Sequence, residues 1–182
     1  MSTTMSDCCG GNSGGERAVA LGGTFELVDH HGQSVTDRSY RGQFMLLFFG
    51  FTHCRAVCPA ALARLSRVID RLGPLASRLQ PLYVTVDPER DTPEVMKAFL
   101  EGKYPRFTGL SGARENIERV KALYRVFAKR TAAPDDATGY QMPHTAFTYL
   151  IGPDGRYVAH FTDAAEEDEL VERLGRYLGL NC

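Results

Sequence analysis

The sequence predicts an α/β fold in which a central mixed β-sheet is covered by helices on both faces. Two runs of apolar residues, 43–51 (QFMLLFFGF) and 82–86 (LYVTV), are typical of strands buried on both faces. A predicted helix follows each run, in residues 59–73 and 95–102. Strands that alternate with helices in this way form a sheet with helices packed on either side.

The composition indicates one folded domain with an N-terminal extension. The chain has 182 residues, of which 43% are hydrophobic and 24% charged, as in an ordinary globular domain. Residues 1–16 are mostly Gly, Ser, Thr and Cys, and such a segment buries too little apolar surface to fold. We therefore expect a flexible tail over 1–16, with adventitious thiols at Cys8 and Cys9, and a domain over 17–182.

Charge and hydropathy exclude two classes of partner. The net charge of −1 gives no basic surface for nucleic acid. No run approaches the roughly 18 apolar residues of a membrane helix, so we expect no transmembrane segment. The start, MSTTMSDCCGGNSGG, has neither the basic head nor the apolar middle of a secretory signal. Either the protein acts where it is made, or a natural leader is missing from this sequence.

The first half of the domain begins with short extended segments. Residues 24–29 (TFELVD) predict a strand, and 30–35 (HHGQSV) a turn that leads into a second one. After the buried strand 43–51, residues 59–73 carry apolar side chains on one helical face and end at Gly73. The three phenylalanines of the strand region are expected in the core: Phe48, Phe49 and Phe51.

In the second half, the segment DPERDTPE follows the strand 82–86. Thr92 is expected to cap the next helix, with Pro93 in its first turn, and Asp91 to serve the same turn. The remaining elements are a strand at 107–110, a helix at 113–130 capped by Ser111, a polar loop at 131–140, two strands within 146–161 around the turn at 152–155, and a helix at 166–178.

Two cysteines lie at the junction of the first buried strand and the helix that follows it. Cys54 and Cys58 are four positions apart, and a cysteine pair at such a junction is the thioredoxin-like arrangement. Residues i and i+4 of a helix have Cβ atoms about 5–6 Å apart, whereas a relaxed disulfide needs about 3.5–4.5 Å. A metal ion bridges that gap with less distortion, because a metal–sulfur bond is about 2.3 Å long. The pair can therefore form a strained disulfide or bind a metal.

The position of the pair favours thiolate chemistry. Cys58 lies near the start of a helix and Arg55 lies between the cysteines, and both features stabilise a thiolate. Thiolates bind soft ions such as copper(I) or zinc. A third, harder ligand would extend the site to copper(II).

His144 is the best candidate for that third ligand. It follows the polar loop and precedes a strand, so it would return to the end of the sheet where Cys54 lies. The other histidines fit other roles: His30 and His31 lie in a turn, His53 is expected to point away from Cys54, and His160 falls within a strand.

Three segments together resemble the Sco/SenC family of copper-binding, thioredoxin-fold proteins. They are GFTHCRAVCPAAL, VTVDPERDTPE and MPHTAFTYLIGPDG, they occur in the family's order, and the resemblance spans about 22–180. It implies that Cys54 and Cys58 are copper ligands and a redox-active pair, and that His144 is the third ligand. Asp87 matches an acidic position near the family's site.

The resemblance also implies a function. Members of the family support assembly of the dinuclear copper centre of cytochrome c oxidase, by delivering copper, by reducing the recipient's cysteines, or both. The partner would be the copper-receiving subunit of the oxidase or another cuproprotein. The chain itself is expected to be a monomer. Family members usually work attached to a membrane, on the periplasmic or intermembrane-space side. Two alternatives remain: a thiol–disulfide oxidoreductase or peroxidase-like enzyme with incidental copper binding, and an adaptor with buried structural thiols.

This chain departs from the family pattern at three points. Arg55-Ala56-Val57 stands where the family usually has Pro-Asp and a variable residue, and the added base favours copper(I) handling or thiol chemistry. The usual membrane anchor is missing from this sequence. Pro143, before His144, is either a cis-proline facing the redox pair or an ordinary trans proline. Cys182, at the C-terminal end, has no assigned role.

Overall fold

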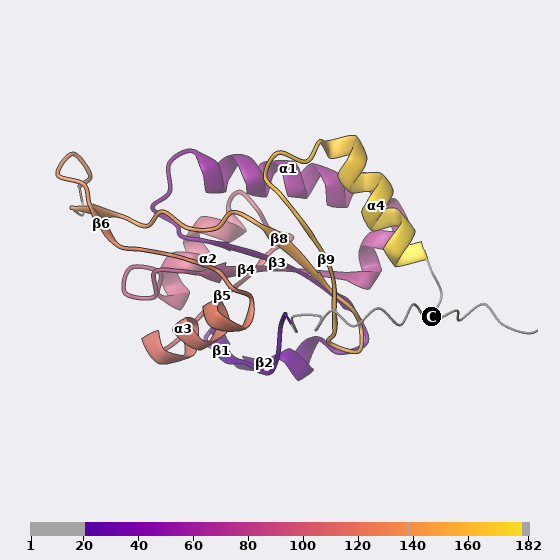
Figure 1. Cartoon of the computed structure of the whole chain (residues 1–182), viewed down its shortest axis with the longest axis horizontal. Coiled ribbons are helices and arrows are strands. Elements are labelled where there is room, and N and C mark those ends of the chain that lie inside the picture. The colour runs from indigo at the N-terminus through magenta and orange to yellow at the C-terminus, as the bar shows by residue number, and fades with distance from the viewer. Residues whose placement is uncertain (1–20, 138, 180–182) are drawn as a thin grey trace, which may run out of the picture.

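The structure of the chain, a computed structural model, describes residues 21–137 and 139–179 (Figure 1). Its strands are β1 (Glu26–Asp29), β2 (Ser34–Thr36), β3 (Phe44–Gly50), β4 (Leu79–Thr85), β5 (Thr108–Ser111), β6 (Thr131–Ala132), β7 (Tyr140–Gln141), β8 (Thr148–Ile151) and β9 (Tyr157–Phe161). Its α-helices are α1 (Val57–Arg71), α2 (Pro93–Glu101), α3 (Arg114–Leu123) and α4 (Glu167–Gly179), with 3-10 helices η1 (Asp37–Tyr40) and η2 (Gly73–Arg78). The predicted tail over 1–16 lies outside the described residues.

Seven strands form one mixed sheet, which confirms the predicted fold class. The strand order is β2-β1-β5-β4-β3-β8-β9, with β3, β4 and β5 parallel and the other neighbours antiparallel. Because β8 runs antiparallel to β3, pairing Thr148 with Phe48, β8 begins at the edge of the sheet where β3 ends. Residues that follow β3 and residues that precede β8 therefore meet at one edge.

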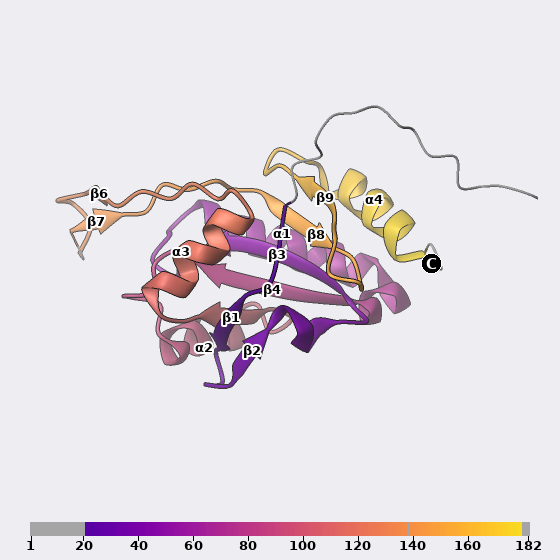
Figure 2. The same ribbon diagram turned by 60° about the horizontal axis from the view of Figure 1, so that its bottom comes forward.

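The sheet separates two apolar cores. Successive side chains of β3 point to opposite faces, so Phe48 packs with Leu62 of α1 while Phe49 packs with Ile117 of α3. Helices α1, α2 and α4 belong to the first core, and α3 covers the other face (Figures 1 and 2). The prediction that β3 is buried on both faces is confirmed, since every residue from Phe44 to Gly50 is buried.

The predicted helix boundaries are confirmed for α1, α2 and α4 to within a few residues, and α3 differs. Thr92 caps α2 as predicted, accepting a hydrogen bond from the backbone N–H of Val95. The cap predicted at Ser111 is wrong: the N-cap of α3 is Ala113, and the Ser111 hydroxyl donates instead to the Asp91 carbonyl. Helix α3 ends at Leu123 rather than at residue 130, and Arg125 beyond it adopts a left-handed conformation with φ of 53°.

The segment predicted as a polar loop contains a hairpin. Strands β6 and β7 pair antiparallel, and the ribbon continues toward the sheet through a bridge between Ala128 and His144 (Figure 2). The backbone N–H of Thr145 donates to the carbonyl of Phe127 at 2.9 Å, and that of Lys129 to Pro143 at 3.0 Å. The polar composition of 131–140 hid this pairing, because the ribbon is mostly exposed and lacks apolar alternation.

Candidate metal centre

The two cysteines lie at the start of α1, immediately beyond the end of β3. Cys54 is half-buried in the loop before the helix, whereas Cys58 is completely buried in its first turn. Both cysteines are free thiols. Cys54, with Val57 and His144, lines a cavity of about 260 Å³ at this edge of the sheet. One sulfur is therefore accessible, and the other lies in the core.

The sulfur of Cys54 accepts a hydrogen bond at the start of α1, as a helix-capping side chain does. The first N–H groups of any α-helix lack partners within the helix. The N-cap of α1, Ala56, makes no side-chain cap bond, and the N–H of Cys58 donates to the Cys54 sulfur at 3.4 Å. Negative charge is favoured at this end of a helix, so the arrangement suits a thiolate at Cys54.

The two thiols differ in acidity as a result. Hydrogen bonding from the Cys58 thiol, and from the N–H groups of residues 56–58, lowers the pKa of Cys54 to about 5, although burial opposes the shift. The pKa of Cys58 is raised, because its thiol donates to Cys54 and is buried. Arg55, expected to stabilise the thiolate, is exposed and is not among the groups that shift either pKa. At neutral pH the pair therefore carries one negative charge, on Cys54.

This asymmetry predicts the pH dependence of alkylation. In reduced, metal-free protein with Cys8, Cys9 and Cys182 changed to Ser, we expect the iodoacetamide rate to be half-maximal near pH 5, at the Cys54 pKa of about 5, and level from about pH 7 to pH 9. An ordinary cysteine, with a pKa near 8.5, would still gain rate in that range. Cys58→Ala removes the thiol that donates to the Cys54 sulfur, so it should raise the pKa of Cys54 and move the rate profile to higher pH. A wild-type midpoint above about pH 7.5 would contradict the assigned acidity.

His144 reaches the cysteines from the other side of the β3 end. Its Nε2 lies 4.0 Å from the Cys58 sulfur and 3.1 Å from the Phe49 carbonyl oxygen. Nδ1 lies 2.8 Å from the Met142 carbonyl oxygen, so both ring nitrogens face a carbonyl oxygen. A ring that keeps its proton on Nδ1 holds the bond to Met142, and its Nε2 becomes a metal ligand only after it moves away from the Phe49 carbonyl. A hydrogen bond from the other ring nitrogen to a backbone carbonyl is the usual way of orienting a histidine ligand.

Pro143 precedes His144 in the chain, and His53 precedes Cys54. The described residues contain no cis peptide bond, so Pro143 is trans and the cis alternative is wrong. His53 points away from the thiols, toward Thr52 Oγ1 at 3.1 Å and the Asp91 carboxylate at 3.9 Å.

Asp87 acts on the histidine segment through Tyr140. Its buried carboxylate accepts hydrogen bonds from Tyr140 Oη, at 3.1 and 3.2 Å, and from Arg90 Nε. Arg90 and Arg130 lie over the two faces of the Tyr140 ring, each 3.7 Å from its centroid. These contacts hold β7, and the segment that leads from β7 to His144, against the end of β4.

Asp91 has a different role from the one predicted. It is completely buried and accepts hydrogen bonds from Thr52 Oγ1 at 2.6 Å, from Thr52 N–H at 3.0 Å and from Thr85 Oγ1 at 2.7 Å. Burial raises the pKa of Asp91, and these hydrogen bonds oppose the shift. The side chain therefore ties the loop before Cys54 to the end of β4, which the turn reading of DPERDTPE missed.

Two further residues at the site, Gly50 and Tyr83, were not anticipated from the sequence. A Cβ atom at Gly50 would lie 2.6 Å from Tyr83 Oη and 2.9 Å from the Cys58 sulfur, so only glycine leaves room for both groups. A glycine closing an apolar strand just before the cysteine motif was the one available signal for such close packing.

Another group of possible ligands lies away from this edge. Within 21–137 and 139–179, the one set of three His, Cys, Asp or Glu residues whose donor atoms all lie within 4.8 Å of one another is His30, His31 and Glu101. His30 Nδ1 accepts the Gly109 N–H at 2.7 Å, which places the ring proton on Nε2 and leaves no free lone pair. By this measure Cys54, Cys58 and His144 are not a closed ligand set, so joint coordination requires a small shift of the ring or loop.

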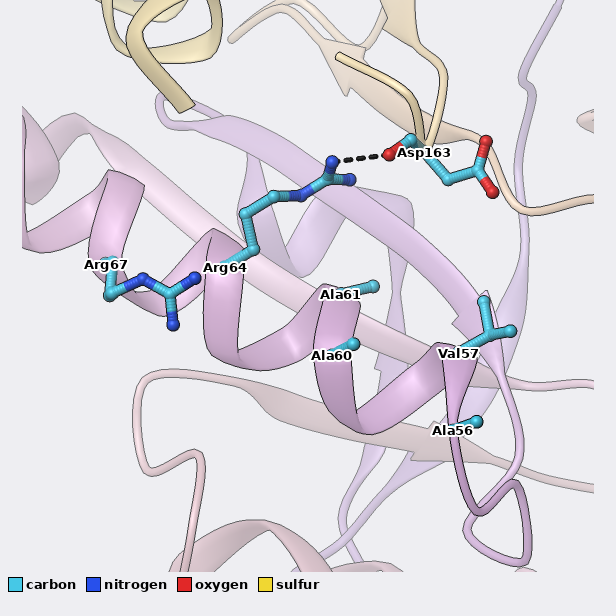
Figure 3. Close-up of a pocket in the computed structure, with 7 residues that line it drawn as sticks. All are labelled: Ala56, Val57, Ala60, Ala61, Arg64, Arg67 and Asp163. Atoms are coloured by element: carbon cyan, nitrogen blue, oxygen red, sulfur yellow. Dashed lines mark hydrogen bonds between the residues drawn. The ribbon is translucent and has the colours of Figure 1, made fainter. Parts of the chain in front are cut away.

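A second hollow adjoins the site along α1. A cavity of about 540 Å³ is lined by Ala56, Val57, Ala60, Ala61, Arg64, Arg67 and Asp163 (Figure 3). Arg64 spans it to donate to the backbone carbonyls of Asp163 and Ala165. The hollow contains no thiol or imidazole, and it shares Val57 with the cysteine cavity.

None of the helices described here is long and apolar enough to span a membrane.

Two related proteins match most of this chain in sequence. The SCO2-like protein of Rickettsia felis is 36% identical over 159 residues, which is 87% of this chain and 78% of the relative. The human protein SCO1 homolog, mitochondrial, is 36% identical over 160 residues, 87% of this chain and 53% of that protein.

Solved structures agree in fold and include copper complexes. Bradyrhizobium japonicum ScoI with copper bound is 42% identical, with a TM-score of 0.78, and the match covers 87% of this chain and 99% of that one. Yeast Sco1 with copper bound is 30% identical, with a TM-score of 0.80, covering 90% and 91%. The family profile described as SCO1/SenC matches residues 13–179. By sequence and by fold, then, the chain belongs to the SCO1/SenC family.

Proposed function

We propose that the chain binds one copper ion through Cys54, Cys58 and His144 and passes it to the copper-receiving subunit of cytochrome c oxidase. The observation that carries the proposal is the meeting of the three residues at one edge of the sheet, with His144 Nε2 4.0 Å from the Cys58 sulfur. The copper complexes of the Bradyrhizobium and yeast relatives support the choice of metal. Copper here is cargo, to be bound and released.

The chemistry of the donors fits copper. Two sulfurs and an imidazole are soft to intermediate ligands, which suit copper and not magnesium or calcium. With one thiolate already present on Cys54, binding of copper(I) displaces a proton from Cys58 and gives a two-sulfur site. His144 Nε2 supplies the third donor once the ring turns from the Phe49 carbonyl, and this is expected to matter more for copper(II).

A second function, reduction of a partner's disulfide, is favoured by the acidity of Cys54. The Cys54 thiolate would attack one sulfur of the partner's disulfide and form a mixed disulfide, releasing the other sulfur as a thiolate. Cys58 would then lose its proton and attack the Cys54 sulfur, releasing the partner's second thiolate. The partner gains two electrons, and the chain is left with a Cys54–Cys58 disulfide, which an external dithiol must reduce.

Titration with copper tests the first function. In full-length protein with Cys8, Cys9 and Cys182 changed to Ser, competition against a copper(I) chelator should show one ion per chain, lost in the Cys54→Ser, Cys58→Ser double variant. His144→Ala should retain copper(I) but weaken copper(II) by about tenfold or more, because two thiolates remain. His160→Ala, a change at an exposed histidine of β9, is the matched control and should bind both ions normally. Full copper binding by the double variant would end the proposal.

Metal-free protein tests the second function. Reduced wild type should reduce a model peptide disulfide, Cys54→Ser should be inactive, and Cys58→Ser should accumulate the mixed disulfide because no resolving thiol remains. Failure of Cys54→Ser to lose this activity would exclude the reductant role.

A further inference from the structure

Tyr83, on β4, has a buried hydroxyl group without a hydrogen-bond partner. Its side chain is 0% exposed, and Oη makes no hydrogen bond of normal geometry with any residue that the structure describes, although the Cys58 thiol lies beside it. Burial of a hydroxyl group without a good hydrogen-bond partner destabilises a folded protein. A role toward a bound ligand or reacting atom is one accepted explanation for such a group.

The hydroxyl shares its surroundings with the Cys58 sulfur. Both atoms lie within 3 Å of the position that a Cβ atom at Gly50 would occupy, Oη at 2.6 Å and Sγ at 2.9 Å. The Tyr83 ring is held in place between Phe48 and Phe99, with 6.0 Å between ring centroids on each side. The donor is thus fixed beside a sulfur that lies in the same core.

Cys58 has weaker support from hydrogen-bond donors than Cys54. Its pKa is raised by Cys54 and by burial, and the Phe51 backbone and the Tyr83 hydroxyl only partly oppose that rise. The N–H groups at the start of α1 are directed to the Cys54 sulfur. Cys58 is 0% exposed and belongs to the apolar core beneath α1. As a copper ligand its sulfur carries negative charge, and a charge in a low-dielectric interior needs nearby hydrogen-bond donors. The hydroxyl of Tyr83 is placed to meet that need.

We infer that Tyr83 is a positioning residue whose hydroxyl donates a hydrogen bond to the Cys58 sulfur when that sulfur holds copper. The inference rests on the proposed copper site and adds a hydrogen-bond donor to one of its sulfur ligands. The hydroxyl keeps its own proton, and the proton that leaves Cys58 on metal binding goes to solvent. A hydrogen bond to a thiolate ligand stabilises the sulfur electrons, and loss of such a partner typically weakens metal binding about 10–100-fold.

Tyr83→Phe tests the inference, because it removes only the hydroxyl. In full-length protein with the three other cysteines changed to Ser, copper(I) affinity against a competing chelator should fall about tenfold. The melting temperature of the metal-free protein should stay the same or rise, since no hydrogen bond of normal geometry is lost there. Tyr149→Phe is the control: Tyr149 is a buried tyrosine of β8 in the opposite core, and its loss of hydroxyl should leave copper affinity unchanged.

A spectroscopic measurement separates a hydrogen bond from a packing effect. In the copper(II) form, the sulfur-to-copper charge-transfer band of Tyr83→Phe should move to longer wavelength, because the sulfur electrons rise in energy without the donor. Unchanged affinity and an unchanged band, or an affinity loss that merely parallels a loss of metal-free stability, would overturn the inference. If wild type bound no copper through Cys54 and Cys58, the proposed function would fall as well, whereas cysteine-dependent binding insensitive to Tyr83→Phe would overturn this inference alone.

Discussion

Replacing Asp91 by alanine is expected to lower the free energy of unfolding by about 3 kcal/mol. The change leaves the hydroxyls of Thr52 and Thr85 and the Thr52 N–H without their acceptor, in a place where Thr85 is 0% exposed. Each unpaired buried donor is worth about 1–3 kcal/mol, and relief of the buried carboxylate offsets part of the total. Chemical denaturation, followed by circular dichroism, measures the difference.

The same variant should weaken copper binding, because Thr52 lies two residues before Cys54 and its loop is no longer anchored. Asp91→Asn keeps one acceptor oxygen and should fall between wild type and Asp91→Ala. Asp70 lies on α1 and makes an exposed ion pair with Arg106. Asp70→Ala is the matched control and should change the free energy of unfolding by less than about 1 kcal/mol. Equal stability of Asp91→Ala and Asp70→Ala would show that Asp91 is not an anchor.

Gly50→Ala is expected to damage the fold and the cysteine pair together. The new Cβ would lie 2.6 and 2.7 Å from the Tyr83 side chain and 2.9 Å from the Cys58 sulfur, distances that force one group to move. The Tyr83 ring is packed between two other rings, so it cannot withdraw freely. We expect a loss of about 1–3 kcal/mol in unfolding free energy, as for other overpacked cores, and a fall in copper(I) affinity measured by chelator competition.

Gly175→Ala provides the control for glycine replacement. Gly175 lies inside α4, and a Cβ there meets nothing closer than Leu72 Cδ2 at 3.9 Å. Alanine in a helix interior is favoured over glycine by about 0.5–1 kcal/mol, so this variant should be slightly more stable and bind copper normally. If Gly50→Ala matched Gly175→Ala in both measurements, the close packing at Gly50 would be wrong.

Much of the fold could be read from local patterns. The apolar run that became β3 and the helical spacing of α1 reflect which faces of each element are buried, and that information is contained in the order of the residues. The capping of α2 by Thr92 followed in the same way from the chemistry of neighbouring residues. The extent of α3 and the hairpin of β6 and β7 could not be predicted, because tertiary pairing decides where an exposed segment becomes regular.

At the site, the order of residues was enough to predict the cysteine pair, its place between a buried strand and a helix, and the resemblance to the SCO1/SenC family, which the comparisons confirm. The residues that surround the pair could be identified only after the elements were packed together. The antiparallel β8 brings His144 to the end of β3, Asp91 turns inward to anchor the loop, and the absence of a side chain at Gly50 lets Tyr83 reach Cys58. Periodicity reports how a residue faces within its own element, whereas these contacts join elements distant in the chain, and their distances depend on how the sheet and helices pack.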